Sequence, residues 1–206
     1  MTTSKDLAFV QGKTFALVLR WATEPIVRKA ISAITTPTGA ARLTVPAHGI
    51  PDGWDCAVVS AKGMTEINAA DPNDIRDGEY TPATVIDANT VELNKINAAG
   101  FKAYTSSGFL QYNTPVSLAG FTARMKIKDK IGGTVLASTD VGDTPLDILT
   151  ITIDDAAKTI TLGVAATATD DLTWTKGVYD LEMVSATGVV TALLSGKVSV
   201  SKEVTT

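Results

Sequence analysis

The 206-residue sequence predicts an all-β protein, in which the two ends of the chain form a β-sandwich around an inserted second β module. Apolar and polar side chains alternate along many short segments, whereas the spacing of an amphipathic helix is nearly absent. Turn residues separate these segments at intervals of about 8–12 residues, which is typical of a sandwich. Apolar residues make up 45% of the chain and charged residues only 19%, which favours a packed core over disorder.

The N-terminal region predicts two strands. Leu7–Val10 is the first, and residues 14–21 place Phe15, Leu17 and Leu19 on one face of the second. Residues 24–34 fit either a strand or a short helix that begins after a proline.

The C-terminal region predicts about five strands. Along Thr122–Lys128 the odd-numbered side chains are apolar, and the even-numbered ones are the basic Arg124, Lys126 and Lys128. The strands expected after it are residues 149–153, 159–164, 178–184, 189–194 and 197–201. A polar turn joins the first two as a hairpin, and residues 195–196 predict a turn between the last two.

Residues 32–114 differ from both ends, because they are richer in Gly, Pro, Asn and Asp and their strands are shorter. The strands expected here are residues 41–45, 55–60, 80–87, 90–93 and 102–105. Residues 1–31 are too few to form a stable sheet alone, but together with residues 115–206 they supply the roughly seven strands of a sandwich. We therefore expect one domain from residues 1–31 and 115–206, with residues 32–114 inserted into a loop at little entropic cost.

Charge, cysteine content and hydropathy exclude several classes of protein. With 22 acidic and 18 basic residues the net charge is −4, so a general attraction to nucleic acid is not expected. The single cysteine, Cys56, lies in an apolar run and is expected to be a buried, unreactive thiol. No secretory signal and no apolar run of about 20 residues is visible, so we expect a soluble protein that is made in a cytoplasm and does not enter a membrane.

The only histidine, His48, is the first candidate for catalysis. It lies beside Gly49 and just before Pro51-Asp-Gly53, which is strong turn chemistry. No Gly-x-Ser-x-Gly motif is present, and the position of Cys56 relative to His48 matches no known catalytic arrangement. We expect His48 to hold a turn, and we expect no enzymatic activity, no catalytic residues, no cofactor and no metal.

The basic stripe Arg124, Lys126, Lys128 and Lys130 allows two interpretations. It is either a solvated strand face that protects a sheet edge, or a contact surface for an acidic protein. No phosphate-binding glycine loop accompanies it.

Four motifs occur in order along the two outer segments, at Gln11-Gly-Lys-Thr-Phe15 and at residues 115–125, 174–183 and 188–200. Together they resemble an immunoglobulin-like domain of bacteriophage tail and baseplate proteins, similar to the N-terminal domain of baseplate upper proteins. The resemblance covers about 115 residues and implies an immunoglobulin-like β-sandwich.

A second set of motifs occurs in the middle segment, at residues 47–58, 64–68, 87–93 and 101–108, with Tyr80 between them. This set is similar to a small β-barrel-like domain of phage virion proteins. The resemblance implies that the inserted module is barrel-like and that His48 has a structural role at the start of a turn.

Residues 69–77 depart from that pattern and predict a lengthened, exposed loop. The loop does not match an EF-hand, because Ile75 and Arg76 stand where a ligand and a glycine are required. A looser oxygen-ligand site stays open, but a solvated acidic loop is the preferred interpretation. As a candidate contact element it contributes Asp71, Asn73, Asp74, Arg76 and Asp77.

The two resemblances imply a non-enzymatic structural component of a bacteriophage virion, in the tail, the baseplate or a fibre attachment. Its expected partners are other virion proteins and copies of itself, and its expected location is the virion. One alternative is a module that binds host glycans or the host surface, with Trp54 and Trp174 as aromatic platforms. Another alternative is a capsid decoration protein.

Overall fold

A computed structural model of the chain describes residues 3–71, 73, 80–143 and 146–203. Their regular secondary structure is almost entirely β-strand, which confirms the all-β prediction; the helical elements among them are α1 (Ala166–Asp170) and two 3-10 turns (Thr65–Ile67 and Val141–Asp143). The chain divides into two compact units. The first unit comprises Met1–Leu19, Ser117–Asp155 and Thr159–Thr206, and the second comprises Arg20–Val116 and Ala156–Lys158.

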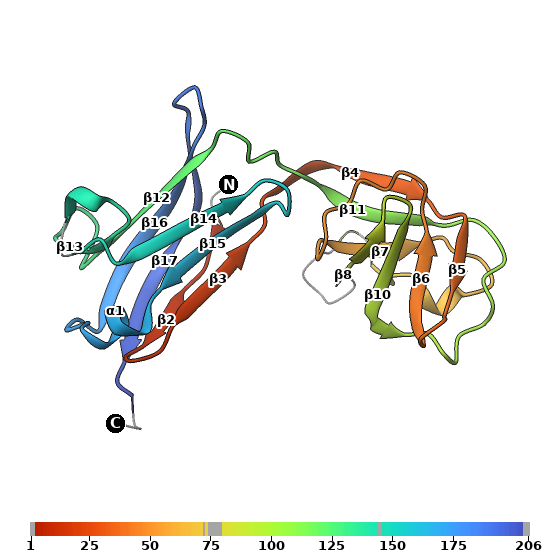
Figure 1. The fold of residues 1–206 in the computed structure, drawn as a ribbon, viewed down its shortest axis with the longest axis horizontal. Helices are drawn as coiled ribbons and strands as arrows, with labels where there is room; N and C mark the ends of the chain where they lie inside the picture. Colours follow the sequence, from red (N-terminus) through yellow and green to blue (C-terminus); the bar gives the residue numbers. More distant parts are fainter. Residues whose placement is uncertain (1–2, 72, 74–79, 144–145, 204–206) are drawn as a thin grey trace. The chain divides into compact units, whose positions relative to one another are not determined.

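The first unit is a β-sandwich of two sheets (Figure 1). The larger sheet has the order β1 (Thr3–Ser4), β17 (Val190–Ser201), β16 (Lys176–Val184), β12 (Thr122–Lys128) and β13 (Val135–Ser138), and β2 (Leu7–Val10) also pairs with β17. The smaller sheet has the order β14 (Leu149–Asp154), β15 (Thr159–Val164) and β3 (Phe15–Leu19).

Side chains from both sheets fill one core between them. Met125 and Leu181 from the larger sheet and Leu162 from the smaller sheet are fully buried in it. Tyr179 belongs to the same core, and Phe15 packs against it. The alternation along β12, β14, β15 and β16 therefore predicted the correct inward faces.

The N-terminal segment covers one edge of the larger sheet. β1 and β2 both run parallel to β17, and between them the Lys5 backbone N–H donates to the Ser195 carbonyl at 2.9 Å. A Cβ atom on Gly196 would lie 2.2 Å from the Lys5 carbonyl oxygen, so only glycine permits this approach. The turn predicted at residues 195–196 is therefore wrong: β17 continues through it, and Gly196 is needed for a close backbone contact.

The second unit contains two four-stranded sheets (Figure 1). One sheet has the order β5 (Ala33–Thr35), β6 (Ala40–Thr44), β10 (Thr90–Asn97) and β9 (Thr84–Asp87). The other has the order β4 (Ala22–Ala30), β11 (Phe109–Pro115), β7 (Asp55–Val59) and β8 (Thr81–Pro82). The described strands do not close into a barrel, so the expectation of a barrel-like module is wrong. The second unit instead has two sheets that pack around an apolar core of their own.

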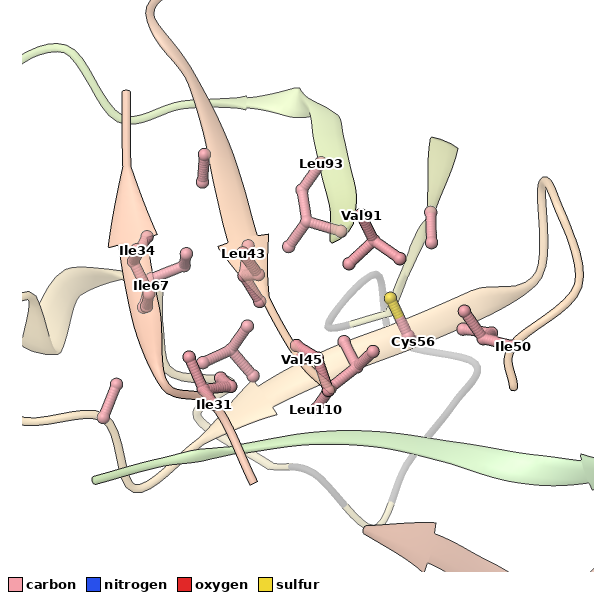
Figure 2. Close-up of a cluster of buried hydrophobic side chains, with 14 of the residues drawn as sticks. Ile31, Ile34, Leu43, Val45, Ile50, Cys56, Ile67, Val91, Leu93 and Leu110 are labelled. Atoms are coloured by element: carbon pink, nitrogen blue, oxygen red, sulfur yellow. The ribbon is translucent and has the colours of Figure 1, made fainter. Parts of the chain in front are cut away.

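Figure 2 shows this second core, in which Leu43 and Leu93 from one sheet meet Cys56 and Leu110 from the other. All four side chains are fully buried. Residues 102–105, which were expected to form a strand, form none, and the neighbouring Ser106 makes only an isolated bridge to Lys62.

Residues 20–31 lie in the second unit, whereas the sequence placed them in the outer domain. The reason is the pairing of β4 with β11, which runs antiparallel from Ala22 opposite Pro115 to Ala30 opposite Phe109. The strands that lead into and out of the second unit are thus neighbours in one sheet. The ambiguous residues 24–34 form strands β4 and β5 and no helix.

Candidate functional site

His48 is a buried structural residue, with only 2% of its surface exposed. Its Nδ1 accepts a hydrogen bond from the Ile50 backbone N–H at 3.1 Å, which leaves the proton on Nε2. Nε2 lies 2.8 Å from the Asp87 carbonyl oxygen and donates to it. Because both ring nitrogens already have backbone partners, the ring holds the turn as the sequence predicted.

Cys56 is buried in the core of the second unit, as predicted. Figure 2 shows its sulfur pointing toward Val91. Burial, with a smaller contribution from the Asp55 carboxylate, raises the pKa of the thiol far above its ordinary value. The thiolate needed for nucleophilic chemistry is therefore strongly disfavoured.

Of the two tryptophans considered as glycan platforms, Trp54 is buried and Trp174 packs against the sandwich core while staying partly exposed. Trp54 is 3% exposed, and its Nε1 donates to the Asn113 carbonyl oxygen at 3.0 Å. Trp174 is half-buried and meets Phe9 edge-on, with 6.4 Å between the ring centroids. The burial of Trp54 rules out its ring as an open aromatic platform, whereas a platform role for the partly exposed Trp174 stays a prediction.

The lengthened loop is only partly described. Asp71 and Asn73 are exposed, and Asp71 Oδ1 accepts a hydrogen bond from the Asn73 backbone N–H at 3.0 Å. The other predicted contact residues, Asp74, Arg76 and Asp77, lie outside the described residues. A contact role for this loop stays a prediction.

The basic stripe lines a groove of about 590 Å³ on the outer face of the larger sheet. Arg124, Lys126 and Lys128 project from β12 on the face opposite the buried Met125 and Ile127, as the alternation predicted. Lys130 joins them from the turn that follows β12. The structure thus brings the four basic residues of the stripe to one concave surface.

Two of these four cations are neutralised within the protein. Arg124 Nε donates to Glu182 Oε2 at 2.7 Å. Lys126 Nζ lies 2.8 Å from Asp143 Oδ2 and 3.8 Å from Asp140 Oδ2. The hydrogen bond between Lys126 and Asp143 raises the pKa of the lysine and lowers the pKa of the carboxyl group.

The other cations of the groove form no ion pair within the described part of the chain. They are Lys128, Lys130 and Lys197, and sequence reasoning did not include Lys197. The register places Val178 of β16 directly opposite both Lys128 of β12 and Lys197 of β17. The alternation along their own strands predicts that the side chains of Lys197 and Val178 point outward. Only the order and register of the strands show that both residues lie beside Lys128 in one row across the sheet.

No protein-family model matches this chain, and no curated protein is significantly similar to it. Among the described residues, no three His, Cys, Asp or Glu side chains are grouped so that they could hold a metal ion. None of the described helices is long and apolar enough to span a bilayer. The groove is the candidate functional site because it gathers the four basic side chains of the stripe on one concave surface.

Proposed function

We propose that this protein is a non-enzymatic structural component of a bacteriophage virion, in the tail, the baseplate or a fibre attachment. In this role an immunoglobulin-like sandwich and the inserted module present rigid β-surfaces to neighbouring virion proteins and to copies of the chain. No cofactor is required, because the contacts are non-covalent.

The observation that carries the proposal is the way the two sets of motifs map onto the two units. The motifs that resemble the phage immunoglobulin-like domain fall almost entirely in the first unit, apart from residues 115–116. The motifs that resemble the second phage domain, from residues 47–58 to residues 101–108, fall entirely in the second unit. Two resemblances drawn from sequence alone thus follow the division of the folded chain.

The two hydrogen bonds of the His48 ring to the backbone and the burial of Cys56 support a structural role. Each of these residue types could act in catalysis, and here each one stabilises the second unit. A protein that works through its surface has no need for a reactive group that is open to solvent.

Immunogold labelling of purified phage particles tests the proposal, with an antibody raised against the isolated chain. We expect gold at the tail, at the baseplate or where fibres attach. Gold spread evenly over the head would favour the alternative of capsid decoration. Particles that carry no label, and no peptide of the chain in their mass spectrum, would refute a virion role.

A further inference from the structure

We propose that the groove on the larger sheet binds an acidic polypeptide segment of a neighbouring protein, with an aliphatic side chain of that segment seated on Val178 between Lys128 and Lys197. The proposal rests on the proposed function only in naming a neighbouring virion protein as the source of the segment. The binding chemistry follows from the groove itself.

The binding position is a row across three strands. Neighbouring strands lie about 4.8 Å apart, so Val178 separates the backbones of Lys128 and Lys197, which are roughly 10 Å from each other. The half-buried Val178 side chain forms an apolar floor between the two ammonium groups. At the rim of the groove, Lys130 adds another ammonium group and Ile131 adds an apolar side chain that is 93% exposed.

Charge favours an acidic ligand at this end of the groove. Arg124 and Lys126 are neutralised by Glu182 and Asp143, whereas Lys128, Lys130 and Lys197 have no ion pair among the described residues. The nearest carboxylates are those of Asp6, whose Oδ1 accepts a hydrogen bond from the Lys197 backbone N–H at 2.9 Å, and Asp129, whose Oδ1 accepts one from the Lys130 backbone N–H at 2.9 Å. The lining of the groove includes five basic and three acidic side chains, so it is positive on a chain whose net charge is −4.

A polypeptide fits the groove better than a nucleic acid does. The carboxylates of Asp140, Asp180 and Glu182 also line it, and a continuous phosphate backbone would have to pass over them. The only aromatic residue in the lining is Tyr179, whose side chain is buried in the sandwich core and offers no surface for base stacking. A peptide can place separate carboxylates beside the lysines and an aliphatic group between them.

Fluorescence anisotropy with the full chain tests the inference, and the probe is a fluorescein-labelled peptide of sequence Asp-Glu-Leu-Glu-Asp. The double variant Lys128→Glu/Lys197→Glu is expected to bind it at least about tenfold more weakly, because it replaces two attractive charges by repulsive ones. Asp180→Asn is expected to strengthen binding severalfold, an effect that misfolding cannot produce. The matched control Lys62→Glu/Lys95→Glu reverses two exposed charges in the second unit and should leave binding unchanged.

Three results would overturn the inference. One is an equal loss of binding in the groove variant and in the control variant. Another is tighter binding of an oligonucleotide of equal charge, which would assign the groove to nucleic acid. The third is equal binding of a peptide with serine in place of leucine, which would remove the role of Val178. Failure here would leave immunogold labelling of particles unaffected, so the two proposals can fail separately.

Discussion

The Tyr179 hydroxyl links the N-terminal segment to the core of the sandwich. Its ring is 3% exposed, and its hydroxyl donates to the Lys5 carbonyl oxygen at 2.7 Å. Burial, reinforced by the carboxylates of Asp6 and Asp180, raises the pKa of Tyr179 to about 12. Ionisation of this side chain would remove the only proton that the hydroxyl can donate.

This pKa shift predicts a loss of stability at alkaline pH. A group whose pKa is raised on folding stabilises the protein fully below its unfolded pKa, here about 10, and less as the pH approaches 12. We expect the free energy of unfolding, measured with urea at a series of pH values, to fall between these limits. Tyr179→Phe should flatten this decline and cost about 1 kcal/mol at neutral pH through the lost hydrogen bond.

A second tyrosine, Tyr112, also contributes to the pH dependence of stability. Burial also raises its pKa, so the decline should become shallower in Tyr179→Phe without disappearing. An unchanged pH dependence in Tyr179→Phe would contradict the assignment.

Single residues were predictable from sequence where local chemistry determines them. The turn around His48 and the burial of Cys56 were both predicted correctly, because proline, glycine and an apolar run act locally. One partner of the His48 ring, the Ile50 N–H, is local, but the other is not: Asp87 lies 39 residues away and meets the ring only after folding. For the same reason the row of Lys128, Val178 and Lys197 could not be read from alternation.

At the scale of the element, Gly196 holds the N-terminal segment against β17. We expect Gly196→Ala to cost about 1–3 kcal/mol, because the new methyl group would overlap the Lys5 carbonyl oxygen. The loss should be visible in thermal unfolding. It should also appear as faster amide exchange at Lys5, whose N–H donates to Ser195.

Gly100→Ala is the matched control, since no atom lies within 4 Å of a Cβ built there. Its stability should stay close to that of the unaltered chain. Equal effects of the two substitutions would show that Gly196 has no special packing role.

The prediction of strands was correct where the alternation of apolar and polar side chains determines which face of a strand is buried. It was wrong where contacts with distant segments determine whether a segment forms a strand or a turn. β12, β14, β15 and β16 were identified with their inward faces correct. Serine and glycine at residues 195–196 favour a turn locally, yet here the glycine permits a close approach of two backbones. Residues 102–105 were expected to form a short strand, but no strand of the described chain pairs with them.

At the scale of the whole molecule, the second unit leaves and rejoins the chain at adjacent points. Ala22 and Pro115 are paired across β4 and β11, and the Val116 N–H donates to the Trp21 carbonyl at 2.9 Å. That hydrogen bond has the geometry that closes a two-residue hairpin turn. The insertion itself was predictable from the number of strands, but its boundary was not, because pairing over more than 80 residues of sequence has no local signal.

We therefore expect the sandwich to fold after Ala22–Pro115 is replaced by Asn-Gly, which favours such a turn. The shortened chain should unfold in one cooperative thermal transition followed by circular dichroism, and its amide NMR spectrum should be well dispersed. A broad transition with collapsed chemical shifts would mean that the sandwich depends on the second unit.

The two sets of buried side chains described above have no member in common. A substitution that repacks one set leaves the other untouched, so natural selection can alter either half while the other is held constant. Descendants of a common ancestor can then retain one half in recognisable form long after the other half has diverged.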